Sequence, residues 1–206
     1  MKYFIVVIIY ILSVYASCNK HGDCITKTYS FATGIKTYPD TDSLNINDTI
    51  WLDFSSPTRL VDLGTSNMID YSQASLSMSI DFLEFTGGSV SNPGVIPAVN
   101  AFDYKIIYGT FIPDNLSADK NKDYKVLEIS GEYKFKLGII PKRTGIFSFI
   151  PIDANNVFRN NDPCTKAGFS ISFANTNQHL YFYLQNRPGY VPSQYEQTHM
   201  YCFKVK

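Results

Sequence analysis

The sequence predicts an all-β protein built as an antiparallel β-sandwich, and three observations lead to this prediction. Short segments alternate apolar and polar residues, a period of two that is typical of strands with one buried face. Clusters of Gly, Pro, Asn and Asp divide these segments at short intervals, as turns between strands do. The chain also contains 15 Tyr and 15 Phe, residue types that favour strands. Many short strands with regular turn signals are typical of a sandwich or a barrel.

The N-terminal segment has the pattern of an export signal. Lys2 precedes an apolar run over residues 3–14, and the small residues Ala16 and Ser17 follow that run. A helix that crosses a bilayer needs about 20 apolar residues, so this run is short for a membrane span. We therefore predict that residues 1–17 are a signal peptide and that the protein is exported.

Two cleavage sites remain open. A signal peptidase that cuts after Ala16 would find small residues at Val14 and Ala16. Residues 15–18 also form a loose bacterial lipobox, in which cleavage before Cys18 leaves that residue to carry acyl chains. We favour this lipidated form, because Ala16 and Ser17 suit a lipobox. Three acyl chains at Cys18 would attach the protein firmly to a membrane, because each buried acyl methylene contributes about 0.8 kcal/mol. Residues 18–25 are then a tether, and residues 26–206 form a single β-sandwich domain.

Strand signals recur through the first half of the chain. In residues 76–82, Leu76, Met78, Ile80 and Phe82 alternate with polar residues, which indicates one buried face. We predict strands over 25–36, 49–54, 76–82 and 102–111. Segments rich in Gly, Ser, Pro and charged residues predict loops over 86–97 and 113–123.

The second half of the chain contains the clearest alternation. Tyr133, Phe135 and Leu137 alternate with two lysines, and a turn signal over 141–145 precedes an apolar segment over 146–152. This pattern predicts an antiparallel hairpin. We further predict a polar loop over 155–163 and strands over 169–173 and 200–205. For residues 179–185 the periodicity does not decide between a strand and a short helix. No long amphipathic helix is indicated, and the sandwich that we favour is immunoglobulin-like, with Greek-key connections.

The cysteine count depends on the cleavage site. The chain has four cysteines, and an exported protein can form disulfides. If Cys18 is acylated, Cys24, Cys164 and Cys202 remain, which allows one pair and one thiol. If Cys18 is free, all four cysteines can pair, with three possible connectivities. We favour a bond between Cys164 and Cys202, because both flank the C-terminal strands. A bond from Cys24 to either of them would instead hold the N-terminal segment in place.

Net charge excludes one class of partner. The chain has 18 basic and 18 acidic side chains and a formal net charge of zero. A balanced chain without a basic cluster has no electrostatic attraction for a phosphate backbone. We therefore expect no nucleic-acid partner.

Parts of the sequence resemble uncharacterised lipoproteins of Bacteroidota that carry an immunoglobulin-like β-sandwich domain. The stretch Ile46-Asn47-Asp48-Thr49-Ile50-Trp51-Leu52 resembles their second strand, which opens soon after a lipidated cysteine and a tether. Gly145-Ile146-Phe147 and the ending Tyr201-Cys202-Phe203-Lys204-Val205 are also similar. The resemblance implies a lipid-anchored β-domain at the bacterial outer membrane, on its periplasmic or its surface side. It carries over no catalytic residue.

The sequence contains no motif for catalysis or cofactor binding. It has no G-x-S-x-G nucleophile elbow, no H-E-x-x-H zinc motif and no Gly-rich phosphate loop. We therefore predict a non-enzymatic envelope protein without cofactor or metal, a binding or assembly module with an envelope protein or a glycan as partner. The alternative is a secreted glycan-binding or glycan-cleaving protein. In that case Tyr38, Tyr190 and Tyr195, which lie in segments containing Pro and Gly, are candidates for a surface on which sugars stack.

Overall fold

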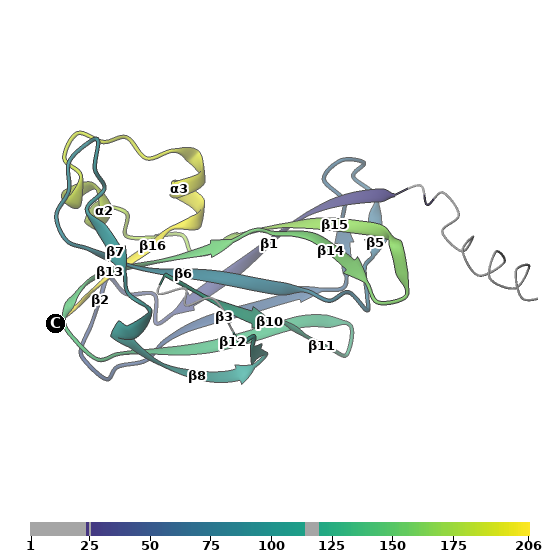
Figure 1. Cartoon of the computed structure of the whole chain (residues 1–206), viewed down its shortest axis with the longest axis horizontal. Helices are drawn as coiled ribbons and strands as arrows, with labels where there is room; N and C mark the ends of the chain where they lie inside the picture. The colour runs from purple at the N-terminus through teal and green to yellow at the C-terminus, as the bar shows by residue number, and fades with distance from the viewer. Residues whose placement is uncertain (1–23, 25, 114–119) are drawn as a thin grey trace, which may run out of the picture.

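The structure, a computed structural model, describes residue 24 and residues 26–113 and 120–206. The predicted signal peptide, Cys18 and most of the predicted tether lie outside these residues. In the described part, two seven-stranded sheets pack face to face, and a two-stranded hairpin and two short helices complete the fold (Figure 1). The protein is therefore mostly β, with a sandwich-like arrangement of two sheets.

Sheet A has the strand order β11-β12-β3-β1-β15-β14, and β8 pairs with β12 on the same edge as β11. Its strands are β1 (Lys27–Tyr38), β3 (Ile50–Pro57), β8 (Phe102–Tyr108), β11 (Leu127–Ile129), β12 (Glu132–Pro141), β14 (Ala154–Arg159) and β15 (Asp162–Phe173).

Sheet B has the order β2-β16-β13-β6-β10-β9, and β7 pairs with β6 beside β10. Its strands are β2 (Ser43–Leu44), β6 (Ser77–Phe85), β7 (Val95–Pro97), β9 (Thr110–Phe111), β10 (Asn121–Lys125), β13 (Gly145–Ile152) and β16 (Tyr201–Val205). The separate hairpin consists of β4 (Arg59–Val61) and β5 (Met68–Asp70).

Both sheets are mixed, so the prediction of a wholly antiparallel sandwich was wrong. Strand β1 runs parallel to β15 over nine residue pairs, and β2 runs parallel to β16. Alternation with a period of two places side chains on a face, but it is the same for either strand direction. The sequence pattern therefore located these strands without fixing their orientation. The strand order does not establish the immunoglobulin-like topology.

The predicted hairpin over residues 133–152 was also wrong. Strand β12 belongs to sheet A and β13 to sheet B, so the short connection between them carries the chain from one sheet to the other. Phe135 of β12 and Phe147 and Phe149 of β13 are fully buried in one core cluster. The apolar faces of the two strands thus meet across the core, an arrangement that satisfies the same alternation as side-by-side pairing.

At two points along one edge of the sandwich, the chain passes from one sheet to the other between consecutive strands. The predicted strand over 102–111 divides at Gly109, so that β8 lies in sheet A and β9 in sheet B. Gly109 has φ of +100°, and a Cβ there would lie 2.9 Å from both the Lys125 carbonyl oxygen and the Phe135 ring. Glycine has no Cβ, so it adopts this positive φ without strain and avoids both close contacts. In the opposite direction, the chain crosses from β10 to β11 at the buried Val126.

Three segments predicted as loops contain strands. Strand β7 lies within 86–97, β10 begins within 113–123, and β14 with the start of β15 occupies 155–163. In β10, Tyr124 is the only buried residue, so the segment lacks the alternation that marks a strand. It is a strand because β6 supplies backbone hydrogen-bond partners, which a local pattern does not reveal.

Aromatic side chains fill the space between the sheets. Each fully buried ring of this size contributes about 1.5–3 kcal/mol relative to an exposed one. The aromatic side chains that are less than 2% exposed are Tyr71, Tyr124, Tyr133, Tyr201, Phe31, Phe54, Phe82, Phe135, Phe147, Phe149, Phe169 and Phe203.

A helical segment packs on part of the outer face of sheet B. Helices α2 (Tyr181–Asn186) and α3 (Gln194–His199) lie at one end of the sandwich, near β7 and β16 (Figure 1). Phe182 and Tyr183 form a second apolar cluster with Phe85, Met200 and Cys202. The undecided segment 179–185 is therefore helical from Tyr181. Among the described residues, no helix is both long and apolar enough to span a membrane.

Cys164 forms a disulfide with Cys24. The pair that we favoured, Cys164 with Cys202, is not the one present; Cys202 is reduced and buried beneath the helical segment. The bond joins the N-terminal segment to the start of β15, with the two Cα atoms 5.5 Å apart. Disulfides persist in oxidising compartments, which agrees with the predicted export.

Candidate functional site

The outer face of sheet A carries two rows of side chains that cross three adjacent strands. Register places Tyr38 of β1 opposite Trp51 of β3, and Trp51 opposite Gly138 of β12. The next outward row consists of Lys36, Asp53 and Lys136 on the same three strands. We call Tyr38, Trp51, Asp53 and Lys136 the sheet A platform.

Alternation along each strand explains why these side chains face outward. Ile35 and Thr37 of β1 point into the protein and are buried, so Lys36 and Tyr38 point to the opposite face. In β3, the buried Leu52 lies between the half-buried Trp51 and Asp53. The core residues therefore fix the position of the platform, because a shift of one residue would expose the core side chains.

The two aromatic rings of the platform lie nearly parallel. Their centroids are 6.3 Å apart, and the ring planes differ by 19°. A Cβ on Gly138 would lie 2.9 Å from Cζ3 of Trp51, so the indole rests directly on the backbone of β12. Tyr38 is 36% exposed. The platform thus presents aromatic surface to solvent at a fixed orientation.

Lys136 connects the aromatic and the acidic parts of the platform. Its Nζ lies 3.5 Å from a carboxylate oxygen of Asp53, 5.0 Å from the ring centroid of Tyr38 and 5.5 Å from that of Trp51. These distances are within the range of cation–π attraction. The Tyr38 hydroxyl, aided by Asp53, raises the pKa of Lys136 although burial opposes this. The lysine is therefore a charged donor beside a charged acceptor.

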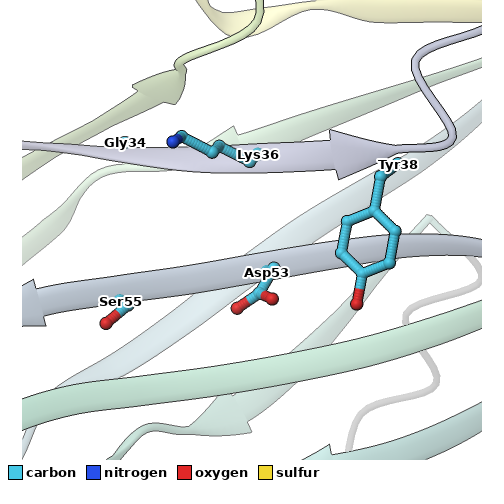
Figure 2. Close-up of a pocket in the computed structure, with 5 residues that line it drawn as sticks. All are labelled: Gly34, Lys36, Tyr38, Asp53 and Ser55. Carbon is cyan, nitrogen blue, oxygen red and sulfur yellow. The ribbon is translucent and has the colours of Figure 1, made fainter.

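The platform borders a shallow depression of about 260 Å³. Its lining residues are Gly34, Lys36, Tyr38, Asp53 and Ser55 (Figure 2). Figure 2 shows the Tyr38 ring reaching from β1 across β3, with the Asp53 carboxylate beside it and Ser55 further along β3. Asp53 is the only carboxylate among these lining residues. The arrangement offers an aromatic wall, one acceptor group and several donors, which are suited to holding a polar ligand.

The structure does not bring the three candidate tyrosines together. Tyr38 belongs to the platform, whereas Tyr190 and Tyr195 lie in the helical segment that packs on sheet B. The Arg187 guanidinium covers the Tyr190 ring at 3.4 Å from its centroid. The Tyr195 ring stacks on His199, with centroids 3.9 Å apart. Neither ring contributes to the sheet A platform.

Arg187 and Glu196 hold the helical segment together. Arg187 donates hydrogen bonds to the Ser89 and Val90 carbonyl oxygens and to the Tyr183 hydroxyl. Glu196 accepts hydrogen bonds from the hydroxyls of Tyr183 and Tyr190. Burial raises the pKa of Glu196, but these hydrogen bonds outweigh it and hold the pKa below its usual range. This network has a structural role.

The sequence prediction missed Trp51, Asp53 and Lys136 as site residues. Trp51 lies between Ile50 and Leu52, so alternation alone places its large ring on the outer face of a strand. That signal was present in the sequence. The register that aligns β12 with β3 was not, because it depends on pairing between strands far apart in the chain. No group of three or more His, Cys, Asp or Glu residues in the described ranges could hold a metal ion.

Comparisons with known proteins add little to this geometry. No protein-family model and no curated protein matches the chain. One solved structure that is similar to it is the crystal structure of the CupB6 tip adhesin from Pseudomonas aeruginosa, with 10% sequence identity and a TM-score of 0.21. The match covers 74% of this chain and 42% of that chain. At this TM-score the likeness carries no argument about fold or function.

Proposed function

We propose that this protein is a non-enzymatic binding module of a bacterial cell envelope, anchored by a lipid on Cys18, and that the sheet A platform binds its ligand. The Tyr38–Trp51 pair, in which Tyr38 is exposed and Trp51 half-buried, carries this proposal. Aromatic side chains are costly to leave in water, and they concentrate where proteins bind ligands and partners. Here they lie on a sheet face beside a charged donor and acceptor.

The position of the platform supports its role in binding. The helical segment packs on part of the outer face of sheet B, whereas Lys36, Tyr38 and Ser55 on the outer face of sheet A are exposed. A ligand can therefore approach the platform without displacing part of the protein. The rigid sheet beneath it also reduces the conformational entropy that binding would remove.

The chemistry of the platform supports binding rather than catalysis. Hydrolysis of a glycosidic bond normally requires two carboxyl groups on opposite sides of the bond, and Asp53 is the only carboxylate among the residues that line the depression. His179 and His199 are buried in and beside the helical segment. The glycan-cleaving form of the alternative hypothesis thus receives no support from this site.

The anchor is tested by the intact mass of the mature protein extracted from membranes. We expect a chain that begins at Cys18 and carries the added mass of acyl groups. A chain without acyl mass that begins at Ser17 would contradict the anchor. It would favour the alternative, a secreted glycan-binding protein, which keeps the same platform but lacks membrane attachment.

The binding surface is tested by sedimentation with cell envelopes isolated from a Bacteroidota species. The mature chain produced without residues 1–18 avoids membrane insertion and keeps every residue that the structure describes. Ser55 is exposed and lines the depression, so the Ser55→Tyr substitution should fill the site and leave the core unchanged. We expect wild type to sediment and this variant to remain in solution.

A matched control is Tyr195→Ala, which removes an exposed aromatic ring from the helical segment. It should sediment as wild type does, and circular dichroism should show that all variants are folded. Equal sedimentation of wild type and Ser55→Tyr, or no sedimentation of wild type, would contradict the proposed function.

A further inference from the structure

We infer that the ligand of the sheet A platform is an uncharged pyranose sugar within a glycan chain, which rests its ring face on Tyr38 and Trp51. This inference rests on the proposed function and specifies its ligand class. It follows from three properties of the platform, namely the orientation of its rings, the spacing of its charged groups and the residues that surround it.

The aromatic pair fits the apolar face of a sugar ring. A pyranose presents a row of C–H groups on one face, and these carry partial positive charge. The face of an aromatic ring carries partial negative charge, so the two attract at van der Waals contact. Trp51 rests on the β12 backbone and is held within 19° of the plane of Tyr38. The rings are thus fixed before a ligand arrives.

The charged pair fits neighbouring sugar hydroxyls. Asp53 only accepts hydrogen bonds, and Lys136 only donates them. Their charged atoms are 3.5 Å apart, so two adjacent hydroxyls of one sugar can engage both groups, one as donor and the other as acceptor. Hydrogen bonds to charged groups are stronger than those between neutral groups. The Ser55 hydroxyl, which lines the same depression, can bind a further sugar oxygen.

The surroundings favour an uncharged polar ligand over other classes. Lys136, which borders the depression, is paired with Asp53, and Lys36 is the only cation among the residues that line the depression. One cation does not make a surface for a polyanion, which requires several phosphate contacts. The depression is lined by glycine, serine and charged residues besides Tyr38, so an apolar peptide side chain or an acyl chain would find no aliphatic pocket.

Trp51 is the only tryptophan of the chain, so its fluorescence reports on this site. We would titrate the mature chain, produced without residues 1–18, with oligosaccharides of glucose, galactose, mannose, rhamnose and N-acetylglucosamine. We expect at least one of these probes to change Trp51 emission in a saturable manner. Asp53→Asn and Lys136→Gln should each weaken that binding by about tenfold, because each removes a charged hydrogen-bond partner.

Two controls locate the binding. Tyr195→Ala should bind the same oligosaccharide with wild-type affinity, and Ser55→Tyr should not bind it. If no oligosaccharide changes the Trp51 emission, the inference about the ligand is overturned. Sugar binding that is unaffected by Asp53→Asn, Lys136→Gln and Ser55→Tyr also overturns it, because the sugar then binds elsewhere.

The failure of this inference is distinguishable from the failure of the proposed function. Sedimentation with envelopes that is abolished by Ser55→Tyr but not competed by any of the oligosaccharides would retain the platform as a binding surface. It would assign the platform a ligand of another class, such as an envelope protein. Loss of both sugar binding and envelope binding would remove the two proposals together.

Discussion

Tyr38 and Trp51 stand directly opposite each other on β1 and β3, and their rings lie nearly parallel on the outer face of sheet A. Trp51 in turn lies over Gly138 of the next strand. The sheet therefore sets the position of both rings through backbone register rather than through a mobile loop. Such an arrangement is suited to binding, because the groups that contact a ligand are already ordered.

Substitution of Gly138 should disturb the platform without disrupting the core. A Cβ at this position would lie 2.9 Å from Trp51, which is too close, so Gly138→Ala should lift the indole from β12. We expect greater quenching of Trp51 fluorescence by acrylamide and envelope binding weakened by about tenfold. Gly168→Ala on β15 is the matched control, since its nearest contact would be 3.5 Å, an ordinary distance. Equal quenching in both variants would contradict the contact between Gly138 and Trp51.

The disulfide should contribute measurably to stability. Cys24 and Cys164 are 140 residues apart in the chain, and disulfides that close long loops typically contribute about 2–4 kcal/mol. We expect Cys164→Ser to lower the free energy of unfolding in urea by this amount. Removal of Cys24 should have the same effect, and Cys202→Ala should leave the bond in place. A bond still present in the Cys24→Ser variant, seen by mass after thiol labelling, would contradict this pairing.

Asp62 should make the stability depend on pH in acid. Its carboxylate accepts hydrogen bonds from the backbone N–H groups of Ser30 and Thr65 and from the Thr65 hydroxyl. The Ser30 N–H, followed by the Thr65 hydroxyl, lowers the pKa of Asp62. A lowered folded-state pKa contributes stability above the unfolded pKa of about 3.9. That contribution is lost as the pH falls through the folded-state pKa.

Urea unfolding between neutral pH and about pH 2 measures this effect. We expect Asp62→Asn to be less stable than wild type at neutral pH, with a difference that shrinks in acid. The control is Asp103→Asn, because the Asp103 side chain is 68% exposed and pairs with Lys142 at the surface. A difference between wild type and Asp62→Asn that stays constant with pH would show that the carboxylate is not stabilised in the folded state.

Arg187 should stabilise the helical segment and leave the platform unaffected. Its guanidinium is buried and donates to Ser89, Val90 and Tyr183. Its removal leaves two carbonyl oxygens without their donor, so we expect Arg187→Met to lower the free energy of unfolding by about 2–4 kcal/mol. Arg187→Lys should recover only part of this free energy, because an ammonium group cannot reproduce the planar arrangement of donors in a guanidinium. Amide hydrogen exchange over residues 86–94, the segment that Arg187 contacts, should become faster in Arg187→Met. Unchanged exchange there would contradict this role.

The sequence indicated most of the strands but not their partners. Alternation identified β6 and β12, the strand predicted over 49–54 corresponds to β3, and the terminal strand predicted over 200–205 corresponds to β16 (Tyr201–Val205). The parallel pairing of β1 with β15 joins residues more than a hundred positions apart, and no local pattern encodes it. The same limit explains the wrong hairpin. Two neighbouring amphipathic strands can pair in one sheet or face each other across the core with identical patterns.

The candidate site was predictable in part. Tyr38 was predicted from the sequence because it lies in a segment containing Pro and Gly, and it belongs to the platform. Tyr190 was named for a similar reason, but Arg187 occupies its ring, a contact that depends on the fold of the helical segment. Trp51, Asp53 and Lys136 become a group only when β12 and β1 flank β3. The chemistry of the site thus arises from register, which the sequence pattern does not specify.

The most direct test of the platform is the accessibility of Trp51 when the protein is bound to envelopes. Acrylamide quenching of the single tryptophan would be compared for the free and the envelope-bound protein, with the signal of a Trp51→Phe variant subtracted as background. We predict that quenching falls on binding, because the ligand covers the platform. Equal quenching of Trp51 in the bound and the free protein would contradict the proposal and show that another surface makes the contact.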